Sequence, residues 1–210
     1  MILQGSMFAP QSSWTVPDVF PQFSETETVA IDLETYDPHL MTCGPGWATG
    51  RGHIVGIGVA TQNWSGYFPI RHEGGGNLDE TIVLRWLTNL LNSTKRDVIF
   101  HNALYDVGWL RREGIIVKGK ILDTIVAAPL INENRFSYSL DNLGVAYCDE
   151  KKDESLLQDA ALAFGVNPKS EMYKLHAKYV GPYGQQDAAL TLKLWNKLKL
   201  EIAEQGLDKI

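Results

Sequence analysis

The order of its apolar segments constrains the fold of this chain more than any other feature. Residues 27–34 alternate apolar and polar side chains with the period of two that is typical of a strand. Residues 53–60 and 65–70 have the composition of two further strands, and the connection between them is short enough for a hairpin. The sequence therefore predicts a sheet that begins with three antiparallel strands.

Beyond these strands, helical and strand-like segments alternate. A helix capped by Asn77, one that begins near Asn102 and a last one that begins at Pro182 are the clearest. This order predicts the α/β class, with a mixed five-stranded sheet of three antiparallel and then two parallel strands, covered by helices on both faces. The predicted segments are a helix at 77–91, a strand at 96–100, a helix from 102, a strand at 119–124, and helices near 124–131, 138–147, 153–164, 172–179 and 182–204.

Length and composition predict one domain. A chain of 210 residues with 44% hydrophobic and 21% charged side chains has the size of a single globular unit. Residues 27–210 are expected to form it, and residues 1–26 to form an N-terminal extension. Within that extension, residues 1–6 resemble an appended junction, because Gly5 and Ser6 precede a second methionine, Met7.

Cysteine usage and hydropathy indicate the compartment. Cys43 and Cys148 lie far apart, and neither belongs to a CxxC or Cys/His cluster, so we expect no disulfide framework and no structural zinc. No apolar run approaches the roughly 18 residues that a membrane span needs, and the N-terminus lacks the features of a signal peptide. These observations predict a soluble, cytoplasmic protein without a membrane partner.

Two carboxylates share one face of the first strand. Asp32 and Glu34 are two residues apart, so they project from the same face, while Ile31 and Leu33 project from the other. Two like charges held together disfavour ionisation of both unless a cation lies between them. The pair is a candidate metal or acid/base site, although on its own the pattern also fits a solvated strand edge.

Two further acids lie on predicted helices. Asp187 follows Tyr183 by one turn, on a stripe that is otherwise mostly apolar and continues through Thr191 and Leu194. Burying an unpaired carboxylate there would be costly, whereas metal coordination would offset the lost hydration. Asp106 lies just after a helix start at Asn102, where it could equally be a simple helix-start acid.

These motifs occur together in one order: D-x-E at Asp32 and Glu34, N-x-x-x-D at Asn102 and Asp106, and Y-x-x-x-D ending at Asp187. The combination resembles the DEDD superfamily of 3′–5′ exonucleases, in the subclass whose third motif carries tyrosine. Segments around the motifs also resemble the proofreading exonuclease domain of phage-type family A DNA polymerases, over roughly residues 27–205. The resemblance implies an RNase H-like fold and a 3′–5′ exonuclease domain at 27–210. The similar segments are DLETYDPHL, the GPG loop at 44–46, YFPIRHEGGGN at 67–77, LDT at 122–124 and SYSLDNLG at 137–144.

The resemblance also implies roles for single residues. Asp32, Glu34 and Asp187 would hold one metal ion, Asp32 would bridge to a second, and Asp106 would act on that second ion directly or through water. Tyr183 would hydrogen-bond the attacking water.

Three more residues would lie on the substrate side. Leu33 and Thr35 would contact the terminal nucleotide, although Leu33 is equally explained as a core residue. Asn102 resembles a substrate-side residue of the second motif, and its alternative role is a helix cap.

The donor set and the net charge bear on cofactor and substrate. A site made of oxygen ligands without His or Cys selects two hard ions, Mg²⁺ or Mn²⁺, over zinc. A formal net charge of −6 argues against a large basic surface for nucleic acid. It allows a short contact, since bound cations reverse the local sign.

The resemblance therefore implies a metal-dependent exonuclease that releases nucleoside 5′-monophosphates from single-stranded or frayed DNA 3′ ends, with a polymerase domain or subunit as partner. The chain is too short to hold a polymerase domain itself, so we expect a proofreading module or a free-standing relative. Two alternatives stay open: a free-standing 3′–5′ exoribonuclease of the same superfamily, and a non-catalytic nucleic-acid-binding domain on the same scaffold.

Overall fold

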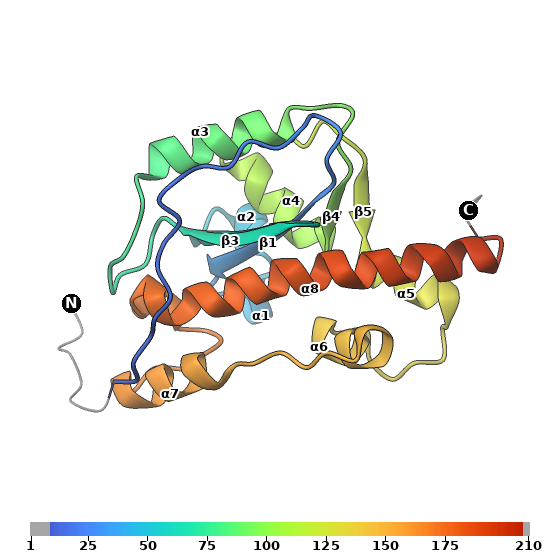
Figure 1. The fold of residues 1–210 in the computed structure, drawn as a ribbon. Helices are drawn as coiled ribbons and strands as arrows, with labels where there is room; N and C mark the ends of the chain where they lie inside the picture. The colour runs from blue at the N-terminus through green and yellow to red at the C-terminus, as the bar shows by residue number, and fades with distance from the viewer. Residues whose placement is uncertain (1–8, 208–210) are drawn as a thin grey trace.

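A computed structural model describes residues 9–207, and its centre is a five-stranded sheet with helices on both faces (Figure 1). The strand order is β3-β2-β1-β4-β5. β1 pairs antiparallel with β2, and β2 with β3, whereas β1–β4 and β4–β5 are parallel, so the predicted mixed sheet is confirmed. The strands are β1 Val29–Tyr36, β2 His53–Thr61, β3 Trp64–Pro69, β4 Val98–Phe100 and β5 Ile121–Asp123.

The helices divide between the two faces of the sheet. α3 and α4 cover one face, and α8 lies across the other with α5, α6 and α7 on its side (Figure 1). Residues 37–52, which connect β1 to β2, contain two single-turn helices, α1 and α2. The helical segments are α1 Leu40–Cys43, α2 Gly46–Thr49, α3 Glu80–Leu91, α4 Ala103–Arg112, α5 Thr124–Ile131, α6 Leu140–Leu143, the π-helical η1 Gly144–Cys148, α7 Ser155–Phe164, the 3₁₀ turn η2 Met172–Lys174 and α8 Ala177–Glu204.

The alternation along β1 sends its side chains into two different environments. Ile31 and Leu33 enter the apolar core under α3 and α4, whereas Ala30 packs with Ala188 of α8 on the opposite face. α8 approaches this second face closely, since a Cβ on Gly58 would lie only 2.3 Å from the carbonyl oxygen of Gly184. Glycine at this position therefore allows α8 to lie against the sheet at Gly184.

The long last helix begins earlier than predicted. α8 starts at Ala177, so Pro182 lies inside the helix, and the separate helix predicted at 172–179 is only η2 followed by the first turn of α8. Proline has no N–H to donate to the carbonyl of Lys178, four residues back. The hydroxyl of Ser12 donates to that carbonyl instead, at 2.8 Å, which explains how the helix continues through a proline.

The cap of α3 also differs from the prediction. α3 begins at Glu80, and the side chain of Asp79, not Asn77, accepts the backbone N–H of Ile82 at 3.0 Å. Asn77 instead bonds both backbone groups of His72, at 2.7 and 2.8 Å, and so closes the turn that precedes the helix.

Residues 9–26 cross α8 and then run toward α3 (Figure 1). Trp14 packs edge-on against Tyr67 and donates a hydrogen bond to Gln185 of α8. Phe20 stacks on Phe68 of the main core at a ring distance of 5.5 Å. The expectation for residues 1–6 lies outside the described residues.

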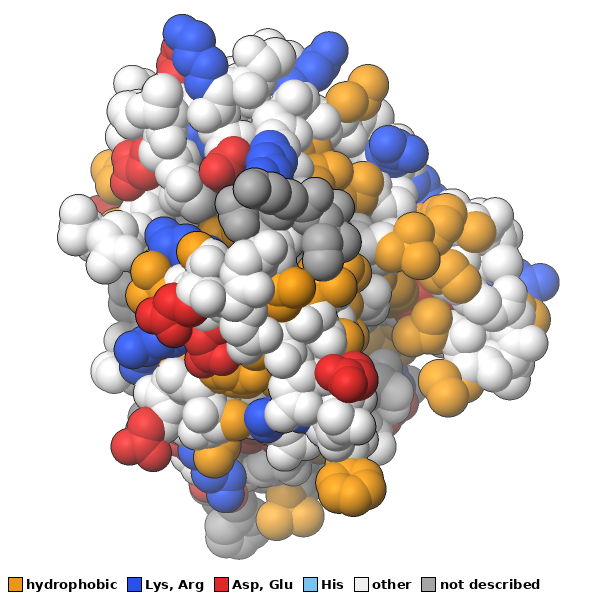
Figure 2. Space-filling model, turned by 90° about the vertical axis from the view of Figure 1, so that its right-hand side faces the viewer, with side chains coloured by type: hydrophobic (Ala, Val, Ile, Leu, Met, Phe, Trp, Pro, Cys, Tyr) orange, Lys and Arg blue, Asp and Glu red, His pale blue; other side chains and the backbone are white. Residues whose placement is uncertain are grey.

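The surface carries both signs of charge. Figure 2 shows Lys and Arg side chains spaced apart and interspersed with acids on the face at the C-terminal end of α8. Both cysteines are unpaired, as expected, with Cys43 exposed and Cys148 partly buried. Among residues 9–207, no helix combines the length and the apolar composition that crossing a membrane requires.

Candidate active site

Three of the predicted acids meet between β1 and α8. One carboxylate oxygen each from Asp32, Glu34 and Asp187 lies within 4.8 Å of the other two. Glu34 and Asp187 are only 8% and 5% exposed, and Asp32 is partly buried. The register of β1 against β2 shifts directly after Glu34, and such bulges commonly redirect side chains next to functional sites.

The electrostatics of this cluster are unfavourable without a cation. Burial, and then the charge of Asp187, raise the pKa of Asp32 to about 8. Burial and the neighbouring Asp32 raise the pKa of Glu34 well above its usual value, and burial also raises the pKa of Asp187. A divalent cation between the three groups would offset both the lost hydration and the repulsion.

One carboxylate oxygen of the cluster has no partner of its own and could bind a cation. Oδ1 of Asp187 is buried and has no hydrogen-bond partner among the described residues, a state that is costly for a carboxylate oxygen. The cluster offers oxygen donors only, which is the donor set that Mg²⁺ and Mn²⁺ prefer. The residues present therefore fit a hard divalent ion.

The fourth predicted acid, Asp106, lies beside β1 on the edge that pairs with β4. β4 pairs with β1 only at Val29 and Ala30, so the later N–H groups of β1 on that edge need another partner. Oδ1 of Asp106 accepts the N–H of Leu33 at 3.2 Å, and the side chain is 4% exposed. Burial, and then Asp32, raise the pKa of Asp106, so the fourth acid adjoins the cluster without belonging to the group of three.

Tyr183 lies one turn before Asp187 on the same side of α8, as expected. It is partly buried, and burial followed by the charge of Glu34 raises its pKa far above the usual value for tyrosine. The hydroxyl is therefore a neutral hydrogen-bonding group at any ordinary pH.

Lys152 is the site residue that sequence reasoning missed. Its side chain, 7% exposed, reaches from the loop before α7 and donates to Oδ2 of Asp187 at 3.0 Å and to the Tyr183 hydroxyl at 3.2 Å. The sequence around it, KKDE, reads as a solvated charged turn, and nothing local separates Lys152 from the exposed Lys151. Only the tertiary packing of that loop against α8 identifies it.

The three predicted substrate-side residues are placed differently from one another. Leu33 packs into the core under α3 and α4, on the face opposite the acids. The Thr35 hydroxyl is partly buried and lies 2.8 Å from the hydroxyl of Tyr105. Asn102 is exposed at the start of α4, beyond the end of β4.

The alternative role of Asn102 as a side-chain cap is wrong, although the residue occupies the N-cap position of α4. Its side chain makes no capping bond, and the residue has a φ of 78°, in the left-handed region that asparagine adopts more readily than most other residues except glycine. Asp123 of β5 supplies the cap from a neighbouring strand, with one oxygen accepting the N–H of Asn102 at 3.0 Å and the other that of Ala103 at 2.7 Å. Strained backbone of this kind is often found at functional sites.

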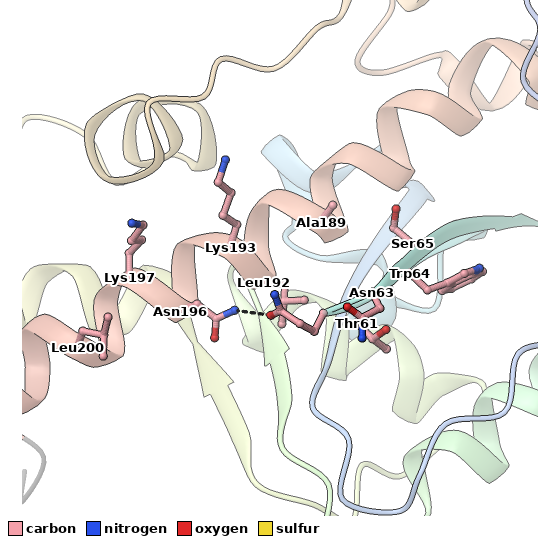
Figure 3. Close-up of a pocket in the computed structure, with 11 residues that line it drawn as sticks. Thr61, Asn63, Trp64, Ser65, Ala189, Leu192, Lys193, Asn196, Lys197 and Leu200 are labelled. Atoms are coloured by element: carbon pink, nitrogen blue, oxygen red, sulfur yellow. Dashed lines mark hydrogen bonds between the residues drawn. The ribbon is translucent and has the colours of Figure 1, made fainter.

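A separate hollow of about 660 Å³ lies between the β2–β3 turn and the C-terminal half of α8 (Figure 3). Figure 3 shows Asn196 directed toward the turn, with a bond to Gln62 of 3.5 Å, while Lys193 and Lys197 extend away from it. Lys193 is paired with Glu150. None of the clustered acids lines this hollow, so the candidate chemistry is elsewhere.

Comparisons with known proteins agree with this geometry. A family model described as 3′–5′ exonuclease, of the type associated with family A DNA polymerases, matches residues 10–203. The chain is 39% identical to a DNA-directed DNA polymerase of Pseudomonas phage M6 over 98% of this chain and 32% of that protein. It is 29% identical to the DNA polymerase DpoZ of Salmonella phage PMBT28 over 91% of this chain and 29% of that protein. The chain thus spans about a third of the length of these relatives.

The fold also matches solved nucleases. A structure of NrnC from Brucella melitensis with bound Mg²⁺ superposes with a TM-score of 0.59 at 16% identity, covering 90% of this chain and 81% of that one. At this identity, the likeness establishes a shared RNase H-like fold.

Proposed function

This chain belongs to the 3′–5′ exonuclease family, and from that membership we propose that it hydrolyses DNA stepwise from a 3′ end and releases nucleoside 5′-monophosphates. It is a nuclease domain related to the proofreading domains of family A DNA polymerases. The observation that carries the proposal is the meeting of Asp32, Glu34 and Asp187, with one buried oxygen of Asp187 left unpartnered.

The acids would hold two divalent ions. Asp32, Glu34 and Asp187 would bind one, and Asp32 with Asp106 the second, with Asp106 acting directly or through water. Bound in this way, Mg²⁺ or Mn²⁺ would stabilise the charge that develops on the attacking and leaving oxygens of an in-line displacement.

The chain's own side chains would position the reactants. Tyr183, kept neutral, would hydrogen-bond the attacking water near Asp187, because it lies one helical turn away on the same side. Thr35 and Asn102 would contact the terminal nucleotide. The proposed contact of Leu33 would be through its backbone, because its side chain lies in the core.

DNA is the proposed substrate because the matched relatives are named DNA polymerases. A site that needs only a few nucleotides of single strand is compatible with the net charge of −6. We further propose a polymerase domain or subunit as the partner, since the relatives are about three times longer than this chain. The unpaired state of both cysteines is compatible with a cytoplasmic location.

Degradation of a 5′-labelled DNA oligonucleotide tests the proposal. We expect stepwise shortening from the 3′ end with Mg²⁺, and none with EDTA or in Asp187→Asn. Asp159→Asn removes an exposed acid of α7 and should act like the unaltered chain. An RNA oligonucleotide of the same sequence should be degraded more slowly.

Undiminished cleavage by Asp187→Asn would contradict the site assignment. Preferential cleavage of the RNA would favour the exoribonuclease alternative. Binding of the oligonucleotide without Mg²⁺ and without any cleavage would favour a non-catalytic domain.

A further inference from the structure

Lys152 places a cation beside the acid cluster. Its ammonium lies 3.0 Å from Oδ2 of Asp187, 3.2 Å from the Tyr183 hydroxyl and 4.7 Å from the centre of the Tyr183 ring. Asp187 and Tyr183 are the two groups of α8 that the proposed function assigns to the ion and to the attacking water. The ammonium therefore neutralises the same carboxylate that a divalent ion would bind.

A second set of acids lies on the outer side of the same ammonium. Asp141 of α6 is 3.7 Å away and Glu154 is 3.9 Å away, and both are more exposed than Asp187. These two distances are too long for good hydrogen bonds, whereas the distances to Asp187 and Tyr183 are within hydrogen-bonding range. Lys152 thus lies between an inner pair, Asp187 and Tyr183, and an outer pair, Asp141 and Glu154.

The outer side offers room for movement. Asp141, Lys152 and Glu154 line a surface hollow of about 470 Å³ between α6 and the start of α7. A lysine side chain has four rotatable bonds and a compact ammonium, so a short outward displacement needs no change in the backbone.

The charge of Lys152 is maintained in this environment. The carboxylates of Asp187, Asp141 and Glu154 lie 3.0, 3.7 and 3.9 Å from its ammonium, and nearby opposite charges favour the charged form. An ammonium and a divalent ion at the same carboxylate repel each other, which sets them in competition.

We propose that Lys152 is a resident cation that neutralises Asp187 until a divalent ion binds there, and that its ammonium then transfers to Asp141 and Glu154. The proposal rests on the proposed function, because it requires that the ion bind at Asp187. It assigns to Lys152 the control of metal affinity, and to the outer pair the role of receiving the displaced ammonium.

The test measures the Mg²⁺ dissociation constant by calorimetric titration, without reference to activity. Lys152→Met should bind Mg²⁺ at least about tenfold more tightly, since a like charge a few ångströms away is removed. Lys152→Arg keeps the charge and should stay close to the unaltered chain. Lys151→Met, at the exposed neighbour, is the matched control and should leave the constant unchanged. If Lys152→Met does not fold, Lys152→Gln carries the same test.

A double-mutant cycle tests the outer pair. Asp141→Asn with Glu154→Gln should weaken Mg²⁺ binding roughly three- to tenfold in the unaltered background, because the displaced ammonium loses its partners. The same pair of changes should have a much smaller effect in the Lys152→Met background. An equal effect in both backgrounds would mean that the outer acids act without Lys152.

The outcomes separate this inference from the proposed function. Equal or weaker Mg²⁺ binding by a folded Lys152→Met protein would overturn the resident-cation role while leaving the exonuclease site intact. Failure of the unaltered chain to bind Mg²⁺ at all would instead overturn the proposed function.

Discussion

The two faces of β1 lie in opposite environments. On one face, Ile31 and Leu33 lie in the apolar core under α3 and α4. On the other, one residue along the strand, Asp32 and Glu34 face α8 with raised pKa values and with Lys152 as a nearby cation. A single strand thus contributes stability through one face and binding chemistry through the other.

The fold can accommodate the crowded carboxylates because the apolar face of the same strand stabilises it. Crowded, buried carboxylates contribute unfavourably to folding in the absence of metal. The apolar face, where Ile31 is fully buried, can offset that cost. Substitutions on the two faces should therefore have opposite consequences for activity and for stability.

The largest effect is expected on the acidic face. Asp32→Asn should reduce the rate of 3′-end cleavage by about 10³-fold, which is about 4 kcal/mol in the activation free energy, because a ligand to both ions is lost. Its free energy of unfolding in EDTA should be equal to or higher than that of the unaltered chain. Single-turnover cleavage and urea unfolding measure the two quantities, and marked destabilisation by this substitution would break the comparison.

On the apolar face the pattern should reverse. Ile31→Ala should lower the free energy of unfolding by about 3–4 kcal/mol, since it leaves a cavity in a fully buried core. Where the protein remains folded, Mg²⁺ affinity should change little. Urea unfolding checks the first quantity and calorimetric titration the second, and a large loss of metal affinity in the folded variant would show that the faces are coupled.

A pH-dependent effect is expected at His72, next to the acidic face. His72 is buried against Tyr67 and the carbonyl of Leu175, and burial lowers its pKa to about 4. Between its ordinary pKa of 6.5 and about 4, the unfolded chain binds a proton that the folded chain does not, so stability falls as the pH is lowered through this range. The loss should approach about 3 kcal/mol at pH 4.

The matched variant is His72→Gln, which keeps a polar side chain for Tyr67 without titrating. The stability difference between the unaltered chain and this variant, measured by urea unfolding in EDTA, cancels the titration of the shared acids. Below pH 6.5, the unaltered chain should lose stability relative to His72→Gln. A stability difference that stays constant from pH 7 to 4 would contradict a buried, neutral His72.

The smallest effect is expected where the N-terminal segment holds α8 over the acidic face. Ser12→Ala should lower the free energy of unfolding by about 1 kcal/mol, because the carbonyl of Lys178 loses the donor that substitutes for Pro182. Ser13 is exposed, so Ser13→Ala is the control. Equal thermal unfolding of the two variants would show that this bond contributes nothing.

Local periodicity accounts for most of what could be predicted. The period of two along β1 placed Asp32 and Glu34 on one face, and the helical stripe placed Asp187 inward, because both depend only on neighbours within one element. The meeting of these segments followed from the strand order and from the family resemblance. The five-stranded sheet could be predicted for the same reasons, and the structure confirms it.

What could not be predicted depends on partners distant in sequence. Helix α8 continues through Pro182 because Ser12 bonds the carbonyl of Lys178, and α4 is capped by Asp123 of another strand instead of Asn102. Lys152 belongs to a loop with no periodic signal, so only its contacts with Asp187 and Tyr183 distinguish it from Lys151. Each case requires tertiary contacts that no local pattern encodes.

The central claim is that acids from remote segments converge on hard divalent ions, and Mn²⁺ located by anomalous scattering in crystals of this chain tests it most directly. We expect a peak in contact with the carboxylates of Asp32, Glu34 and Asp187, and a second peak nearer Asp32 and Asp106 when a nucleotide is bound. A crystal of active protein that holds Mn²⁺ only at other surfaces would contradict the account.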